Sequence, residues 1–199
     1  FLLYLSMAED KSRKGEIDSP IRDMIDEINI DPKLSTTSSC SGRIVVYQKL
    51  ENIRKTNCNW LLVLHEPINL EQLQDSLRNV TTGGIVFAKF EPFILHCQCA
   101  DMETARCLLI CGLNSGFRES GIVVGKNDRF TVAIRSSQIM EVPLTNNSGK
   151  VIVPDEYLDQ LVSLLNQRMQ VTAERRDKFL TEFRNRFRSS KEQLEYSVQ

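Results

Sequence analysis

Apolar residues at helical spacing recur in four parts of the chain. The first helix is predicted after Ser19-Pro20 and ends at Asp31-Pro32. Asn69, followed three residues later by Gln72 as in a capping box, predicts the start of a second helix. Asp101 predicts the start of a third helix, which ends near Gly116. The fourth begins at Pro154 and, with a second apolar stripe further on, predicts a helix of more than about 30 residues.

Between these helices lie segments that favour β-strands. β-branched and aromatic residues are dense in each of them. The predicted strands cover 43–48, 59–66, 85–87, 92–99, 121–125 and 130–136, with short ones at 140–144 and 150–153. The segments at 85–87 and 92–99 form either a pair or one long bent strand.

Strands and helices interleave without regular β-α-β alternation, which predicts an α+β fold with mixed sheets. We expect residues 1–153 to form a compact α+β catalytic domain. We expect residues 154–199 to form a long basic amphipathic helix that packs on this domain. The chain has no glycine-rich G-x-G-x-x-G loop, Walker loop or H-E-x-x-H motif, so a Rossmann, P-loop or zincin site is not expected.

Charge is balanced overall but not locally. The 199 residues are 41% hydrophobic and carry a net charge of −1, which does not favour a nucleic-acid or membrane surface for the molecule as a whole. The segment 168–191, however, has eight basic and three acidic side chains. It is either a packed helix with a solvated face or a surface for phosphate groups.

Neither the opening residues nor the cysteines indicate secretion. The opening FLLYLS is too short to span a bilayer and lacks the features of a signal peptide. Six cysteines without such a signal are expected to be free thiols. We expect a cytoplasmic protein without membrane association, and the sequence indicates no obligate protein partner.

The stretch TTSSCSGR, residues 36–43, combines hydroxyls, a thiol, a glycine and an arginine. One interpretation is an anion site in which Ser38, Ser39 and Arg43 donate hydrogen bonds. The other is a polar turn before a strand. Cys40 as a nucleophile is less favoured, because a thiol needs a base and only His65 and His96 offer an imidazole.

A zinc site is a possible interpretation of the cysteines but not the favoured one. Cys97 and Cys99 share a strand face, and Cys107 and Cys111 share a helix face. Their spacing differs from that of zinc knuckles, and buried free thiols are common. No metal ligand is therefore predicted.

Charged and aromatic residues alternate in KFEPFILH, residues 89–96. On a strand Lys89, Glu91 and Phe93 would share one side, either at an exposed edge or in a lined cavity. The loop GFRESG at 116–121 carries an aromatic ring and a pair of opposite charges. It is either a binding loop or a solvated connection between a helix and a strand.

Seven stretches in order resemble the tRNA wybutosine-synthesising protein 3 family, the methyltransferase of wybutosine biosynthesis. They are DKSRKGEID (10–18), STTSSCSGR (35–43), WLLVLH (60–65), KFEPFILH (89–96), SGFRESGI (115–122), VAIRSS (132–137) and EVPL (141–144). The long C-terminal helix is also similar. Cys97 and Met140 replace apolar residues expected from the family.

The resemblance implies an S-adenosyl-L-methionine-dependent methyltransferase. Its substrate would be a ring nitrogen of a tricyclic modified guanosine, next to the anticodon of phenylalanine tRNA. The resemblance also implies action on the anticodon loop in the cytosol and a base that carries an amino-acid side chain.

For methyl transfer to a nitrogen, the protein must align the methyl donor with the acceptor nitrogen and remove the proton of that nitrogen. It must also hold the positively charged sulfonium group of the donor. Glu91 with Phe90 and Phe93 is a candidate for the sulfonium. The methionine carboxylate is expected at the Ser38–Arg43 loop or at Arg135-Ser136-Ser137.

Other residues of the matched stretches are candidates for the RNA substrate and for the proton. Phe117 is the expected stacking ring, with Arg118 beside it. Arg118 with Glu119, or Lys14 with Asp18, would pair with the amino-acid side chain, and Lys89 would also contact substrate. Asp18, Glu91 and His96 are three alternative bases.

Two other functions remain open at this point. A non-catalytic tRNA-binding module would use the basic helix and the aromatic loop but would not bind the cofactor. A cysteine-dependent hydrolase or transferase would depend on Cys40.

Overall fold

The computed structural model describes residues 16–50, 58–78, 80, 83–187. The sequence also predicts a short helix near Leu2–Met7; that segment and the predicted substrate residue Lys14 lie outside these residues. The chain divides into two compact units, one of Phe1–Ser41, Phe93–Ser137 and Ala173–Gln199, the other of Gly42–Pro92 and Gln138–Thr172. We call them unit 1 and unit 2.

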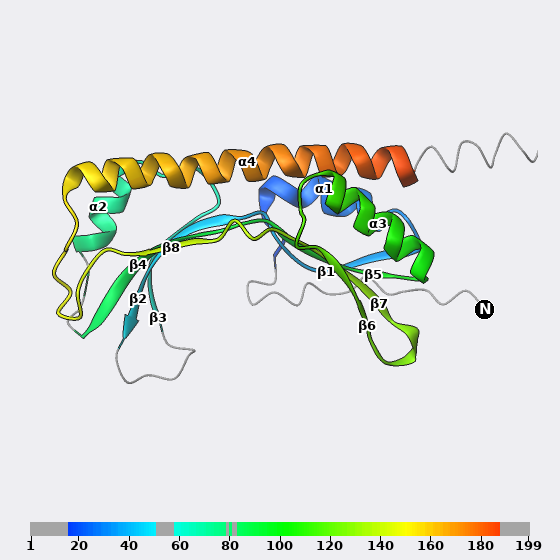
Figure 1. Ribbon diagram of the computed structural model, residues 1–199, viewed down its shortest axis with the longest axis horizontal. Helices are drawn as coiled ribbons and strands as arrows, with labels where there is room; N and C mark the ends of the chain where they lie inside the picture. The colour runs from blue at the N-terminus through cyan, green and yellow to red at the C-terminus, as the bar shows by residue number, and fades with distance from the viewer. Residues whose placement is uncertain (1–15, 51–57, 79, 81–82, 188–199) are drawn as a thin grey trace, which may run out of the picture. The chain divides into compact units, whose positions relative to one another are not determined.

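Unit 1 contains a four-stranded sheet of order β1-β5-β7-β6. Its strands are β1 (Leu34–Cys40), β5 (Ile94–Cys99), β6 (Gly121–Val124) and β7 (Phe130–Arg135). Its helices are η1 (Ser19–Ile21), α1 (Arg22–Asn29), α3 (Met102–Asn114), η2 (Lys126–Asp128) and the C-terminal part of α4 (Asp155–Phe187). Figure 1 shows α1, α3 and this part of α4 on the same side of the sheet.

The core of unit 1 lies between that side of the sheet and the helices. It includes Ile25 and Ile28 of α1, Leu108 of α3 and Phe179 of α4, all with at most 1% of their surface exposed. Asp101 caps α3 as predicted, because its side chain accepts a hydrogen bond from the Thr104 N–H.

Unit 2 contains a second four-stranded sheet, of order β3-β2-β4-β8. Its strands are β2 (Arg43–Leu50), β3 (Cys58–Leu64), β4 (Gly84–Glu91) and β8 (Met140–Pro143), and its helices are α2 (Leu70–Arg78) and the first part of α4. The predicted capping box forms: the Gln72 N–H donates to Asn69 Oδ1, and the Asn69 N–H donates to Gln72 Oε1.

The two helical segments of unit 2 cover one face of its sheet (Figure 1). That face presents Ile44, Val46, Val86, Ala88 and Phe90, which have no exposed surface. Since strand side chains alternate, the residues between them lie on the opposite face, which we call the outer face of unit 2.

The α+β class is confirmed, but several details of the prediction are wrong. The described strands pair antiparallel in both sheets, not in a mixed pattern. Such sheets need no helical crossover, which fits the missing glycine loop. Residues 34–40 form β1, because Thr36 and its neighbours pair with β5 rather than turning. Residues 150–153 contribute only a single bridge, Thr145 to Val151.

The predicted division at residue 153 differs from the division in the structure. Each unit is assembled from separated segments, and α4 contributes residues to both. The long apolar stripe of α4 explains this, because Leu158 and Leu165 enter the core of unit 2 whereas Phe179 and Phe183 enter that of unit 1.

Candidate functional site

In unit 1, two matched stretches, 10–18 and 35–43, meet beside an arginine of α4. The Asp18 carboxylate accepts a hydrogen bond from the Ser41 N–H at 2.8 Å. Arg176 Nη1 donates to the Ser41 carbonyl oxygen, also at 2.8 Å. Asp18 and Ser41 have 7% and 3% of their surface exposed. The backbone of Ser41 is therefore held on both sides by charged groups.

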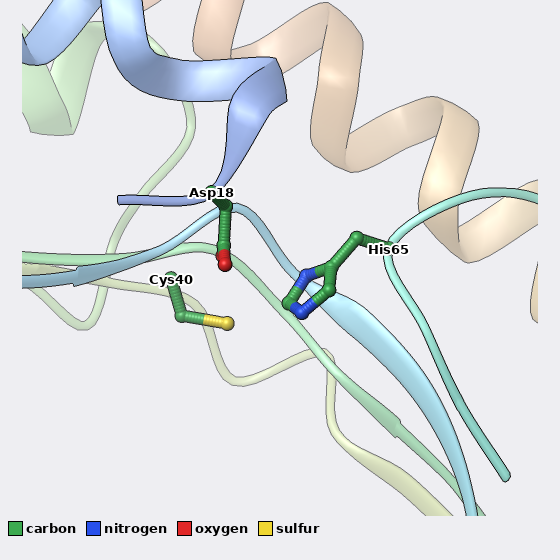
Figure 2. Close-up of side chains that lie close together, drawn as sticks. All are labelled: Asp18, Cys40 and His65. Carbon is green, nitrogen blue, oxygen red and sulfur yellow. The ribbon is translucent and has the colours of Figure 1, made fainter. Parts of the chain in front are cut away.

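Cys40 lies beside this cluster. Figure 2 shows its side chain at the end of β1 and that of Asp18 just before η1, with a carboxylate oxygen and the Sγ atom within 4.8 Å of one another. Burial lowers the pKa of Arg176, whereas Asp177, Cys40 and Asp18 favour its charged form. These contacts hold the end of β1, the segment in which the sequence predicted an anion site.

The second group in unit 1 is centred on His96 of β5. Ser38 Oγ lies 2.9 Å from His96 Nδ1, because Ser38 and His96 are partners in the β1–β5 ladder. Burial lowers the pKa of His96, and the nearby positive charge of Arg135 lowers it further. His96 is therefore neutral at neutral pH and has a hydrogen-bonding partner that orients its ring.

A neighbouring arginine of α4 reaches two more matched segments. Arg175 Nη1 lies 3.5 Å from Ser136 Oγ. The guanidinium also passes Gly116, where a Cβ atom would lie 3.2 Å from Arg175 Nε. Gly116 has φ +89°, a conformation that other residues rarely adopt.

In unit 2, Glu91 holds two cations. Its Oε2 lies 2.6 Å from Arg43 Nε, and its Oε1 lies 2.9 Å from Lys89 Nζ. Burial alone would raise the pKa of Glu91, but the hydrogen bonds from Lys89 and Arg43 outweigh burial and the pKa lies below its ordinary value. Glu91 is thus a charged, engaged carboxylate and a weak base.

Three aromatic rings continue from this cluster along the outer face of unit 2. The Arg43 guanidinium lies 5.4 Å from the centre of the Trp60 ring. Tyr47 contacts Trp60 and Phe87, with ring centres 5.9 and 5.6 Å apart. The Tyr47 hydroxyl donates a hydrogen bond to Glu141, and its pKa is raised by burial and by this carboxylate.

Three predicted site residues are core residues instead. Phe90 has no exposed surface in unit 2, and Phe93 and Phe117 have none in unit 1, where they contact each other and Phe179. The prediction that Phe117 stacks on an RNA base is therefore wrong, because no face of its ring is accessible. The sulfonium role of Phe90 and Phe93 is wrong for the same reason.

Strand geometry explains the error at 89–93. Lys89 and Glu91 share a face of β4, as predicted. The strand ends at Glu91, however, and Phe93 belongs to unit 1, so it does not share a side with them. Arg118, Glu119 and Arg135 are exposed, whereas Ser39 is half-buried on β1.

Sequence reasoning missed five residues of these clusters. Trp60 and Glu141 begin two of the matched stretches, so their position carried a signal that was not used. Arg175 and Arg176 are adjacent cations in a helix with a regular apolar stripe, and the sequence assigned this basic face to solvent or to phosphate groups, not to contacts with loops. Tyr47 looked like an ordinary strand residue.

Each of the two sheets is antiparallel, has helices on one side and carries charged clusters at its strand ends. Proteins of this kind form a class of α+β folds that is distinct from the doubly wound nucleotide-binding folds. Solved structures share this fold. The PH1069 protein from Pyrococcus horikoshii matches with TM-score 0.78 and 31% identity over 85% of this chain and 87% of that one. A hypothetical protein from Aeropyrum pernix matches with TM-score 0.72 and 28% identity over 85% and 99%.

The chain belongs to the family described as Methyltransferase TYW3, whose model matches residues 1–185. The tRNA wybutosine-synthesizing protein 3 homolog of Danio rerio is 41% identical over 85% of this chain and 68% of its own length. That of Homo sapiens is 38% identical over 85% and 66%. A tRNA wybutosine-synthesizing protein 2/3/4 of Oryza sativa is 36% identical over 88% of this chain and 18% of its own length.

The chain thus spans about two thirds of the length of these vertebrate relatives. In the part that the structure describes, no helix is both long and apolar enough to cross a membrane.

Proposed function

We propose that this protein transfers the methyl group of S-adenosyl-L-methionine to a ring nitrogen of the tricyclic wybutosine precursor next to the anticodon of phenylalanine tRNA. The observation that carries this proposal is the family match over residues 1–185. The proposal places the protein in the cytoplasm, in contact with the anticodon loop.

The chain has suitable groups for the anionic end of the cofactor. A methionine carboxylate needs hydroxyl, N–H or guanidinium donors. Unit 1 offers the half-buried Ser38 and Ser39 on β1, with the exposed Arg135 on β7 and Ser136 just after it. The aromatic rings first expected to contact the sulfonium are buried, so these donors, and not Phe90 or Phe93, support the proposal.

When bound, the cofactor would supply a methyl group on a positively charged sulfur, and no nucleophile of the protein is needed. The protein must align the acceptor nitrogen and take up its proton as the nitrogen–carbon bond forms. Of the three alternative bases, Asp18 is buried and accepts the Ser41 N–H, and Glu91 is held by two cations. The hydrogen bonds from its two cations lower the pKa of Glu91, and the Asp18 carboxylate is already occupied by the Ser41 N–H.

His96 fits the role of base better. It is neutral at neutral pH, and when Nδ1–H donates to the Ser38 hydroxyl, Nε2 keeps its lone pair for a proton. Glu91 then acts as a fixed negative charge that favours a cationic group nearby. Arg118 and Glu119, exposed after Gly116, are suited to pair with the charged side chain of the substrate base.

Isothermal titration calorimetry with S-adenosyl-L-methionine separates this proposal from a tRNA-binding module without catalysis. We expect saturable binding, weakened by Arg135→Ala and unchanged by the control Arg129→Ala, an exposed arginine just before β7. Binding of tRNA with no detectable cofactor binding would favour the non-catalytic module.

A further inference from the structure

The outer face of unit 2 is a sheet surface that its helices leave uncovered. Helices α2 and α4 pack on the opposite face, through Leu73, Leu161 and Leu165. On the outer face Trp60 and Val63 of β3 keep 49% and 41% of their surface exposed. Large apolar groups left accessible on a sheet indicate a binding surface.

Aromatic rings are grouped on this face rather than scattered. Tyr47 of β2 lies between Trp60 of β3 and Phe87 of β4, in contact with both. The Tyr47–Glu141 hydrogen bond and the contact of Arg43 with the Trp60 ring fix this group from two sides. Rings held in place lose little entropy when a ligand stacks on them.

Cations outnumber carboxylates on the same face. Arg43 and Lys89 share the single carboxylate of Glu91. Lys49 lies on the same face of β2 as Arg43 and Tyr47, because strand side chains alternate between faces, and it is exposed. Among the residues that the structure describes, the carboxylates set against these three cations on the face are Glu91 and Glu141, and Glu141 also accepts the Tyr47 hydroxyl. A surplus of positive charge beside exposed rings is complementary to single-stranded nucleic acid.

We propose that the outer face of unit 2 binds unpaired RNA, with a base stacked on Trp60 and phosphate groups contacted by Lys49 and Lys89. The inference rests on the proposed function, which makes an RNA loop the substrate, and it assigns the surface that holds that loop. Unpaired bases expose the ring faces that stacking requires, whereas a double helix does not. An open sheet suits several bases in a row better than a single small molecule.

The chain contains one tryptophan, so its fluorescence reports on this face alone. The probe is an RNA hairpin with the anticodon loop of phenylalanine tRNA, and the control probe is the same stem as a closed duplex. We expect saturable quenching by the hairpin, little by the duplex, and none of comparable size by S-adenosyl-L-methionine.

Binding is then measured with labelled hairpin for three variants. Trp60→Ala should weaken it by about 5- to 150-fold, because one base–ring stack contributes roughly 1–3 kcal/mol. Trp60→Phe should restore most of the affinity. Val123→Ala removes an exposed apolar side chain from β6 in unit 1 and should leave affinity unchanged.

A charge variant tests the same surface without altering the rings. Lys49→Ala should reduce the slope of log affinity against log salt by about 0.7, the value for one phosphate contact on a single strand. Lys33→Ala, an exposed lysine of unit 1, should not change it.

Unchanged hairpin affinity in Trp60→Ala, or quenching by the cofactor instead of RNA, would overturn the inference. Neither result affects the proposed function, whose test is cofactor binding and methyl transfer. Conversely, absence of methyl transfer with intact hairpin binding would reject the function and retain the surface.

Discussion

At the scale of single residues, the charged side chains of the matched stretches have partners that decide what each can do. Glu91 is held by Arg43 and Lys89, and Asp18 by the Ser41 N–H. The Nδ1 atom of the His96 ring lies 2.9 Å from the Ser38 hydroxyl. Residue types in a motif could not distinguish these cases, because the partners come from other strands.

The pH dependence of His96 is the first prediction at this scale. Burial and Arg135 lower its pKa below the ordinary value of 6.5. The unfolded chain therefore binds a proton at a higher pH than the folded one. The stability linked to His96 is fully present above pH 6.5 and is lost as the pH falls from there through the folded pKa.

NMR titration measures this directly, since the chain has two histidines and His96→Gln assigns the signals. The His96 midpoint should lie below 6.5, and the acid limb of the rate of methyl transfer should follow that midpoint. In His96→Gln the limb should disappear together with most of the rate. A midpoint above 6.5, or a variant as active as the parent, would reject His96 as the base.

At the scale of elements, α4 connects matched segments that are far apart in the sequence. In unit 1, Arg176 binds the carbonyl at the end of β1, and Arg175 contacts Ser136 and passes Gly116. Two basic residues of this helix, Arg175 and Arg176, thus form contacts with other segments of unit 1. The alternative of a purely solvated or phosphate-binding face does not hold for these two.

Arg176→Ala should lower the free energy of unfolding by about 1.5–3 kcal/mol, because a charged hydrogen bond is lost next to the buried Asp18. Lys178→Ala, two residues further on and exposed, is the matched control. Urea unfolding measures both. Equal, small effects would mean that the Arg176–Ser41 contact adds no stability.

Gly116→Ala tests the loop between α3 and β6. An alanine at φ +89° costs about 1–2 kcal/mol, and its Cβ would also crowd Arg175. Gly121→Ala is the control, because no atom lies within 4 Å of a Cβ there. Thermal unfolding should separate the two variants by several degrees, and similar midpoints would contradict a requirement for glycine at 116.

Much of the secondary structure was predictable, because its signals are local. The capping box at Asn69 and the cap at Asp101 both form. β1 was missed, since Ser and Thr favour turns locally and only pairing with β5 makes them a strand. The burial of Phe117 could not be predicted either, because it depends on Phe93 and Phe179, which lie in distant segments.

At the scale of the whole molecule, the order of the matched stretches was informative where each one alone was not. The stretches are distributed over both units, and the chain passes from one unit to the other several times. A division of the sequence into an N-terminal domain and a C-terminal helix cannot represent this arrangement. Family membership follows from the full length of the match, residues 1–185.

The central claim is that this protein methylates the wybutosine precursor. The most direct test incubates the purified protein with S-adenosyl-L-methionine and phenylalanine tRNA from cells that lack it, followed by mass analysis of the modified nucleoside. We expect the precursor to gain the mass of one methyl group with the parent protein and not with His96→Gln. A precursor of unchanged mass, with protein that binds both cofactor and tRNA, would contradict it.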